Sequence, residues 1–169
     1  MPGVRAGGAG VGVKLVTVMP DNPGRGLPTV QALVAWFDAS TGRPLAILDG
    51  ETVTGMRTGA ASGVASRLLS RPDASRLAVI GAGAQAAWQI RAVLAARPIR
   101  HVAVAARTLA HATTFAAQMT DETGVEVVAA TDARSALADA DIVCCATTSA
   151  TPVFDAADIR PGTHVNGVG

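Results

Sequence analysis

Aromatic and charged residues are both scarce in this chain of 169 residues. Aromatic side chains make up 3% of the sequence and charged ones 16%, whereas charged residues form about a quarter of a typical soluble domain. Because hydrophobic residues still reach 49%, the core must be built from valine, isoleucine, leucine and alanine, as when helices pack closely on a parallel sheet. The low charge also suggests that a partner chain or further sequence covers part of the surface.

Other absences exclude whole classes of protein. The net charge is +1 and no basic run is interleaved with aromatics, which argues against a nucleic-acid partner. No run of about 18 apolar residues is present to cross a membrane, and the glycine-rich start lacks the apolar segment of a signal peptide. The three histidines share no metal-ligand spacing. Cys144 and Cys145 are adjacent and cannot form an ordinary structural disulfide with each other, so we expect buried free thiols in a cytoplasmic protein.

The amino-terminal part predicts an antiparallel meander followed by a helix. Residues 1–10 are rich in glycine and are expected to form a flexible leader. Three strands follow, separated by turn-rich segments and with one face covered, at Val11–Val18, Val30–Asp38 and Leu45–Leu48. Glu51–Leu69 then predicts a helix, with Thr52 or Thr54 as its cap. Two glycines among small residues in its middle suggest that a sheet or a cofactor approaches the helix backbone closely.

From Arg76 the pattern changes to alternating strands and helices. The expected strands are Leu77–Ile80, His101–Ala105, Val125–Ala129, Asp141–Ala146 and Thr163–Asn166. The expected helices are Ala84–Ala96, Leu109–Met119 and Ala133–Ala138. Alternation at this spacing predicts an α/β fold of the Rossmann type, with a doubly wound parallel sheet, preceded by part of an antiparallel α+β domain.

The strongest local motif, Gly81-x-Gly83-x-x-Ala86, joins the first of these strands to the first helix. In that context Gly81 permits a tight turn, Gly83 leaves room for a pyrophosphate, and Ala86 lets helix and strand pack closely. The helix N-terminus would then bind the phosphates of NAD(P). A purely structural glycine turn is the alternative. The residues of this turn that we predict to bind the cofactor are Gly81, Ala82, Gly83, Ala84 and Gln85.

The second strand of such a unit usually ends at an acidic residue, which binds the ribose 2′-hydroxyl. Here Ala106, Arg107 and Thr108 follow that strand, and no carboxylate is present. A cation and a hydroxyl suit a 2′-phosphate, so we predict that NADP(H) is preferred and that NAD(H) is possible. The alternative for Arg107 is a solvated side chain at the end of a strand.

Two further segments complete the predicted cofactor site. Thr147, Thr148 and Ser149 follow the fourth strand, at the edge where ligands bind in open α/β sheets. An ordinary polar loop is the alternative there. Val168, which follows the last expected strand, is also predicted to bind the cofactor.

Lys14, Arg57 and Thr29 are the candidate site residues outside this unit. Lys14 interrupts an apolar strand, and Arg57 lies beside the small-residue part of the helix. A buried cation needs a carboxylate or an anionic ligand, but spacing alone favours exposed side chains for both. Asp139 and Asp141 flank the start of a strand and are expected to bound that element rather than to perform acid–base chemistry.

Six segments of the sequence occur in a specific order. They are Val13-Lys-Leu-Val-Thr-Val-Met-Pro-Asp-Asn-Pro, Gly26-Leu-Pro-Thr-Val-Gln-Ala, Met56-Arg-Thr-Gly-Ala-Ala-Ser-Gly, Ile80-Gly-Ala-Gly-Ala-Gln-Ala, Ala106-Arg-Thr and Ala146-Thr-Thr-Ser. Together they resemble the ornithine cyclodeaminase/mu-crystallin family from about residue 11 to residue 169. The resemblance implies a subunit with a Rossmann domain and a second domain, which binds substrate and pairs two subunits through its sheet. The corresponding parts are 1–55 (partial substrate-binding and dimerisation domain), 56–74 (connecting helix and linker) and 75–169 (NAD(P)-binding domain).

The resemblance also implies a function: an NAD(P)-dependent oxidoreductase of small α-imino or α-amino acids, similar to ketimine or pyrroline-carboxylate reductases. By the same resemblance Lys14 contacts the substrate and assists proton transfer, Arg57 grips the substrate carboxylate, and Thr29 lines the pocket. One alternative is an ornithine cyclodeaminase, which converts L-ornithine to L-proline with catalytic NAD. The other is a non-enzymatic NADPH-binding protein similar to mu-crystallin.

The chain departs from the family at both ends. Family chains have a further amino-terminal segment with another substrate-binding arginine. They also continue beyond His164-Val-Asn-Gly-Val-Gly with a catalytic aspartate and with helices that complete both domains. We therefore expect a fragment of a homodimeric parent that carries the catalytic site only in part and has little activity alone.

Overall fold

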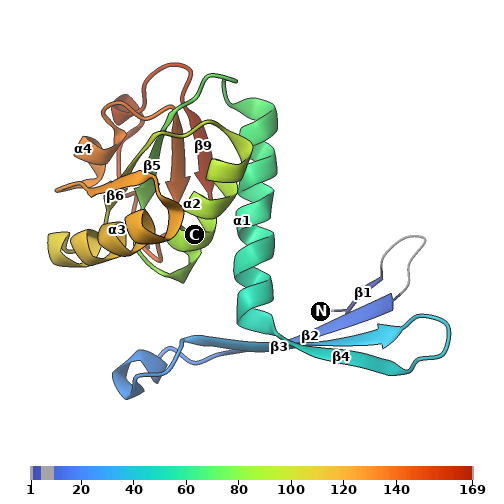
Figure 1. Cartoon of the computed structure of the whole chain (residues 1–169). Helices are drawn as coiled ribbons and strands as arrows, with labels where there is room; N and C mark the ends of the chain where they lie inside the picture. The colour runs from blue at the N-terminus through green and yellow to red at the C-terminus, as the bar shows by residue number, and fades with distance from the viewer. Residues whose placement is uncertain (1, 5–9, 169) are drawn as a thin grey trace. The chain divides into compact units, whose positions relative to one another are not determined.

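The computed structural model describes residues 2–4 and 10–168 of the chain (Figure 1). It consists of two compact units, Met1–Gly55 and Met56–Gly169. The first unit is built on an antiparallel sheet and the second on a parallel sheet. The predicted combination of a doubly wound sheet with an antiparallel segment before it is therefore confirmed.

A four-stranded sheet in the order β1-β2-β3-β4 forms the first unit. Its strands are β1 (Pro2–Val4), β2 (Gly10–Val18), β3 (Val30–Asp38) and β4 (Pro44–Asp49), and the short 3-10 helix η1 (Asn22–Arg25) lies between β2 and β3. The ladder between β2 and β3 runs without interruption from Gly10 opposite Asp38 to Val18 opposite Val30. The three predicted strands are confirmed to within one residue at each end.

The predicted flexible leader is wrong for part of its length. Pro2–Val4 forms β1, which pairs antiparallel with residues 11–13 of β2, and Gly10 already belongs to β2. Proline is tolerated as the first residue of an edge strand, because its missing N–H is not needed for a ladder there. Residues 1 and 5–9 of the predicted leader lie outside the described residues.

Helix α1 (Gly50–Leu69) follows β4 directly. Its cap is Asp49, whose Oδ1 accepts hydrogen bonds from the N–H groups of Glu51 at 2.8 Å and Thr52 at 2.9 Å. The predicted caps Thr52 and Thr54 are wrong, since both already lie inside the helix. Thr54 instead donates its hydroxyl to the carbonyl oxygen of Gly50 at 2.5 Å, a common use of threonine within helices.

A five-stranded parallel sheet forms the second unit, in the order β7-β6-β5-β8-β9. Its strands are β5 (Arg76–Ile80), β6 (His101–Ala105), β7 (Glu126–Ala129), β8 (Ile142–Cys145) and β9 (His164–Gly167). The helices between them are α2 (Ala84–Ala96), α3 (Leu109–Thr123), α4 (Ala133–Leu137) and the 3-10 helix η2 (Ala156–Asp158). The chain moves outward from β5 to β7 and then crosses to the other side of β5, which places the topological switch point between β5 and β8.

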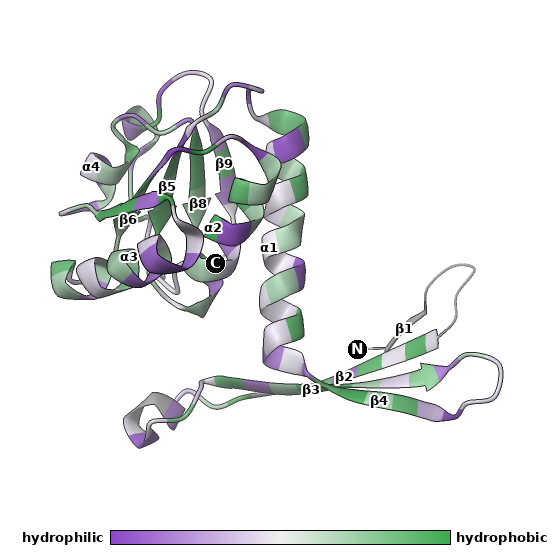
Figure 2. Cartoon of the chain, in the orientation of Figure 1, coloured by the Kyte–Doolittle hydropathy of each residue, from purple (hydrophilic) through white to green (hydrophobic). Residues whose placement is uncertain are grey.

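Alternate residues of the strands build two apolar layers, one on each side of this sheet. Leu77 and Val79 of β5 pack with residues of α2 and α3. Ala78 and Ile80 face the opposite way and pack with α4. Figure 2 shows hydrophobic colouring along β8 and along β5 after its first residue, Arg76, as expected for strands that are buried on both faces.

The small-residue part of α1 lies against α2. A Cβ atom on Gly59 would stand 2.6 Å from the carbonyl oxygen of Trp88, and one on Gly63 would stand 2.9 Å from that of Ala92. The prediction of a close backbone approach is therefore correct, but the neighbour is a helix and not a sheet or a cofactor. Across the described ranges, no helix is long and apolar enough to cross a membrane.

Candidate functional site

The carboxyl ends of four parallel strands meet at one edge of the second unit. The Gly81 N–H donates to the carbonyl oxygen of Ala105 at 2.8 Å, and the Ala146 N–H donates to that of Ile80 at 2.8 Å. On the outer side the Val168 N–H donates to the carbonyl oxygen of Cys145 at 3.0 Å. The structure thus brings the predicted segments around residues 81–85, 106–108, 146–149 and 168 to the same edge, at the topological switch point.

The two fingerprint glycines have different surroundings. Gly81 has φ +109°, and a Cβ atom there would stand 2.2 Å from the carbonyl oxygen of Ala146. Gly83 has an extended backbone, and a Cβ atom there would meet no atom within 4 Å. Ala86 is fully buried beneath the turn. The turn is therefore tight on its inner side and open on its outer side, which fits a pyrophosphate lying against Gly83.

The start of α2 suits an anion for a second reason. Its N-cap is Gly83, which offers no side chain to accept from the N–H groups of the first turn. Asp49, Thr108 and Asp132 each accept such a bond at the starts of α1, α3 and α4. The uncapped first turn of a helix combines N–H donors with the positive end of the helix dipole, which favours phosphate groups.

Arg107 and Thr108 lie just beyond β6. The Arg107 side chain is exposed, and the residues before it are Ala105 and Ala106, so no carboxylate stands in their place. Thr108 caps α3 by accepting from the His111 N–H at 3.3 Å. Its hydroxyl hydrogen is not used in that bond, so Thr108 can serve as a helix cap and as a donor to a ligand.

The loop after β8 is partly held by its own hydroxyl groups. Thr147 Oγ1 accepts from the Ser149 N–H at 3.2 Å, and Ser149 Oγ donates to the carbonyl oxygen of Thr151 at 2.7 Å. Thr148 is exposed between them. The loop therefore combines a structural role with a position at the cofactor edge.

Sequence reasoning missed Gln89. It lies one turn after Gln85 on the face of α2 that also carries Ala86, Ile90 and Val93, and its side chain is fully buried. Gln89 Nε2 donates to Gln85 Oε1 at 3.3 Å, whereas Gln89 Oε1 is buried without a hydrogen-bond partner among the described residues. The signal in the sequence was an amide on a helix face that is otherwise apolar.

Lys14 and Thr29 belong to the first unit. Lys14 Nζ donates to Thr54 Oγ1 near the start of α1. A Cβ atom on Gly50 would stand 2.6 Å from Ala32, which lies on the same face of the sheet as Lys14. The start of α1 therefore packs on that face. Thr29 lies just beyond the far end of the ladder, because Val30 pairs with Val18. Four residue steps separate Val18 from Lys14, roughly 13 Å along the strand. The structure does not bring these two side chains together.

Arg57 is exposed on α1, in the second unit. The substrate candidates Lys14 and Thr29 therefore belong to one unit and Arg57 to the other.

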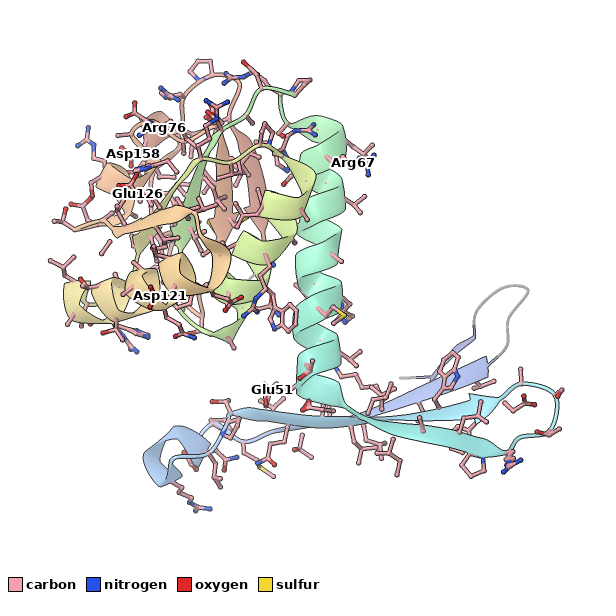
Figure 3. All side chains as sticks on the ribbon, in the orientation of Figure 1. Glu51, Arg67, Arg76, Asp121, Glu126 and Asp158 are labelled. Carbon is pink, nitrogen blue, oxygen red and sulfur yellow. The ribbon has the colours of Figure 1, made fainter. Side chains whose placement is uncertain are left out.

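Cys144 and Asp141 are reactive side chains that are buried within the fold. Burial raises the pKa of the Cys144 thiol to about 12. Both cysteines are free as predicted, but only Cys144 is buried and Cys145 is half-buried. Asp141 accepts from the N–H groups of Ser75 at 2.9 Å and Arg76 at 3.0 Å, so it bounds the start of β5. Arg76 and Glu126, labelled in Figure 3, begin β5 and β7 at the edge opposite the fingerprint turn. The described part of the chain contains no group of three or more side chains placed to hold a metal ion.

Three relatives illustrate what the chain is similar to. It is 40% identical over 169 residues to the Delta(1)-pyrroline-2-carboxylate reductase of Bacillus thuringiensis subsp. konkukian, covering 100% of this chain and 52% of that protein. It is 41% identical to the L-lysine cyclodeaminase of Streptomyces rapamycinicus, covering 98% of this chain and 49% of that protein. The structure of the Thermococcus litoralis Delta(1)-pyrroline-2-carboxylate reductase, in complex with NADH and L-proline, matches with a TM-score of 0.90 and 42% identity, covering 95% of this chain and 50% of that one.

The chain thus spans about half the length of these relatives. The sequence profile of one family matches all of residues 1–169, and the segments that carry the resemblance include both the lysine strand and the fingerprint turn. The chain therefore belongs to the ornithine cyclodeaminase/mu-crystallin family.

Proposed function

We propose that the protein is an NAD(P)-dependent reductase of small α-imino acids, with Delta(1)-pyrroline-2-carboxylate as the substrate to test first. The observation that carries this proposal is the likeness to the Thermococcus litoralis reductase, at a TM-score of 0.90 and 42% identity. The open space beside Gly83 and the uncapped start of α2 support a dinucleotide at the corresponding edge.

In this proposal the bound cofactor supplies a hydride to the imine carbon. Arg57 binds the substrate carboxylate, since a guanidinium matches a carboxylate with two parallel hydrogen bonds. Lys14 orients the substrate or donates a proton, and its bond to Thr54 fixes the position of the ammonium group. The proposed role of Thr29 in lining the pocket rests on the family resemblance alone, because the structure does not bring its side chain to Lys14.

The test is a reductase assay with the purified full-length protein that contains this chain, because we expect the chain alone to have little activity. The assay contains NADPH or NADH and Delta(1)-pyrroline-2-carboxylate. We expect L-proline to form in proportion to the NAD(P)H consumed, and we expect Arg57→Lys mainly to raise KM, because a lysine cannot form the paired contact. The matched control is Arg67→Lys, an exposed arginine near the other end of α1. Absence of both NAD(P)H binding and imine reduction would overturn the proposal.

A cyclodeaminase is the second candidate, favoured by the 41% identity to the Streptomyces rapamycinicus L-lysine cyclodeaminase. Such an enzyme would release ammonia from a diamino acid such as L-ornithine with no net consumption of NAD(P)H. Measuring ammonia and NADH together in one reaction separates the two candidates.

The cofactor preference proposed here is NADP(H) over NAD(H). It rests on Arg107 and Thr108 beyond β6, where a carboxylate would repel a 2′-phosphate. We expect Arg107→Ala to weaken NADPH binding by roughly tenfold and to leave NADH binding unchanged. Arg100→Ala, an exposed arginine just before the other end of β6, is the control. Tighter binding of NADH than of NADPH by the unmodified protein would contradict the preference.

We also propose a cytoplasmic homodimer. The free thiols of Cys144 and Cys145 support a reducing compartment. The dimer is supported by the exposed apolar side chains Leu15, Leu33 and Ile47 of the first unit.

A further inference from the structure

Gln85 and Gln89 form a polar pair within an otherwise apolar part of α2. Gln85 is the second residue of the helix and is half-buried at the cofactor edge, whereas Gln89 is fully buried one turn deeper. Gln89 Nε2 donates to Gln85 Oε1 at 3.3 Å. The other half of the buried amide, Gln89 Oε1, has no hydrogen-bond partner among the described residues.

Stability does not explain the choice of glutamine at this position. An unpaired buried acceptor costs free energy, because it has lost its hydrogen bonds to water and gained none in the protein. The neighbours Ala86, Ile90 and Val93 are apolar and fully buried, so a methionine of similar length would suit the same space. Residues that make a protein less stable than an apolar replacement would are expected mainly at functional positions. Gln89 is a residue of this kind.

The bond between the two amides has a direction that matters for a ligand. Because Gln89 donates to the side-chain oxygen of Gln85, that oxygen is already engaged by a fully buried amide. The NH₂ group of Gln85 then points elsewhere and keeps its two hydrogens for other acceptors. A pyrophosphate presents only acceptor oxygens, so an amide held with its NH₂ group outward binds it and an amide turned the other way repels it.

We propose that Gln89 is a positioning residue, which fixes the Gln85 amide so that its NH₂ group faces the pyrophosphate of the dinucleotide. The proposal rests on the dinucleotide site proposed above. It assigns Gln85 as the residue that touches the cofactor and Gln89 as the residue that acts through it.

The test compares Gln89→Met with the unmodified chain in two measurements, thermal unfolding and ligand titration. We expect the unfolding temperature to stay the same or to rise, because the unpaired acceptor is removed. We expect the affinities for NADH and for ADP-ribose to fall by about fivefold. Binding of AMP, which lacks the pyrophosphate, should not change. Gln118→Met, the same replacement at an exposed position of α3, should alter none of these values.

A double-mutant cycle tests whether Gln89 acts through Gln85. We expect Gln85→Met to weaken NADH binding at least as much as Gln89→Met, and the double variant to bind no more weakly than Gln85→Met alone. Additive losses of NADH affinity in the double variant would overturn the positioning role. So would a lower unfolding temperature of Gln89→Met, if its affinity for AMP fell as much as its affinity for NADH. If the unmodified chain binds neither NADH nor NADPH, both the dinucleotide site and this inference fail. If it binds them and Gln89→Met binds equally well, only the inference fails.

Discussion

A methyl group at Gly81 and one at Gly83 would meet quite different surroundings, although the two glycines share one turn. At Gly81 the added Cβ atom would stand 2.2 Å from the carbonyl oxygen of Ala146, in a backbone conformation that side chains rarely adopt. At Gly83 it would meet open space. The first glycine is thus required by the protein itself, and the second is required only if a ligand occupies the space beside it.

This difference gives a prediction for single substitutions. We expect Gly81→Ala to lower the free energy of unfolding by about 2–4 kcal/mol, through steric conflict and backbone strain. We expect Gly83→Ala to lower it by at most about 1 kcal/mol, the usual size of an N-cap effect, and yet to weaken NADH binding by more than about tenfold. Chemical denaturation and fluorescence titration measure the two effects. Wild-type affinity in Gly83→Ala would show that the open space is not the phosphate site.

Residue patterns predicted the cofactor edge but not the whole of its chemistry. Gly81, Gly83 and Ala86 were found because the fingerprint needs a strand before it and a helix after it, and both patterns are local. Gln89 was missed because its burial depends on how α2 packs on the sheet. The substrate roles of Lys14, Thr29 and Arg57 rest on family resemblance and on no local pattern.

Secondary structure followed from the sequence where the signals were local. The bounds of α2 and β6 agree with the predicted ranges, because the glycine turn and the apolar strand mark them. Helix α3 runs one turn further than predicted, to Thr123, where Gly124 ends it in the left-handed conformation. Strand β1 was not predicted, because its pairing with β2 is a contact between segments that no local periodicity specifies.

The segment before β5 offers a test at the scale of an element. Burial raises the pKa of Asp141, but the N–H groups of Ser75 and Arg76 and the charges of Arg71 and Arg160 outweigh it, so the pKa is lowered overall. We therefore expect Asp141→Asn to lower the free energy of unfolding by about 2 kcal/mol near neutral pH. A folded pKa below the unfolded value means that this contribution is present above about pH 4 and is lost as the pH falls through the folded pKa.

Urea denaturation at about pH 7 and about pH 3 measures this effect. The difference between the unmodified protein and Asp141→Asn should shrink at the lower pH. Asp139→Asn is the matched control, because the Asp139 side chain is 66% exposed and its ion pairs with Arg76 and Arg160 are at the surface. An Asp141 effect that is independent of pH would contradict the assigned role of the charge.

At the scale of the whole molecule, the first unit exposes a connected set of apolar side chains. Leu15 of β2 pairs directly with Leu33 of β3, and Ile47 of β4 pairs with Ala35, two residues further along the same face. Leu15 is 60% exposed, Leu33 40% and Ile47 79%. These residues lie on the face opposite Lys14, since side chains alternate along a strand. Apolar side chains that adjoin across three strands mark an interaction surface more strongly than scattered ones do.

We predict that this face, defined by Leu15, Leu33 and Ile47, pairs two copies of the chain. Ile47→Lys should convert a dimer to a monomer in light scattering across a concentration series, because it would place an ammonium group in an apolar contact. The folded state of the monomer should persist, since Ile47 is already exposed within one chain and its replacement buries nothing. Leu69→Lys is the control, because Leu69 is 73% exposed at the end of α1 and should not affect the mass. A dimer that survives Ile47→Lys would assign the contact to another surface, and the low charge of the sequence would then need a different explanation.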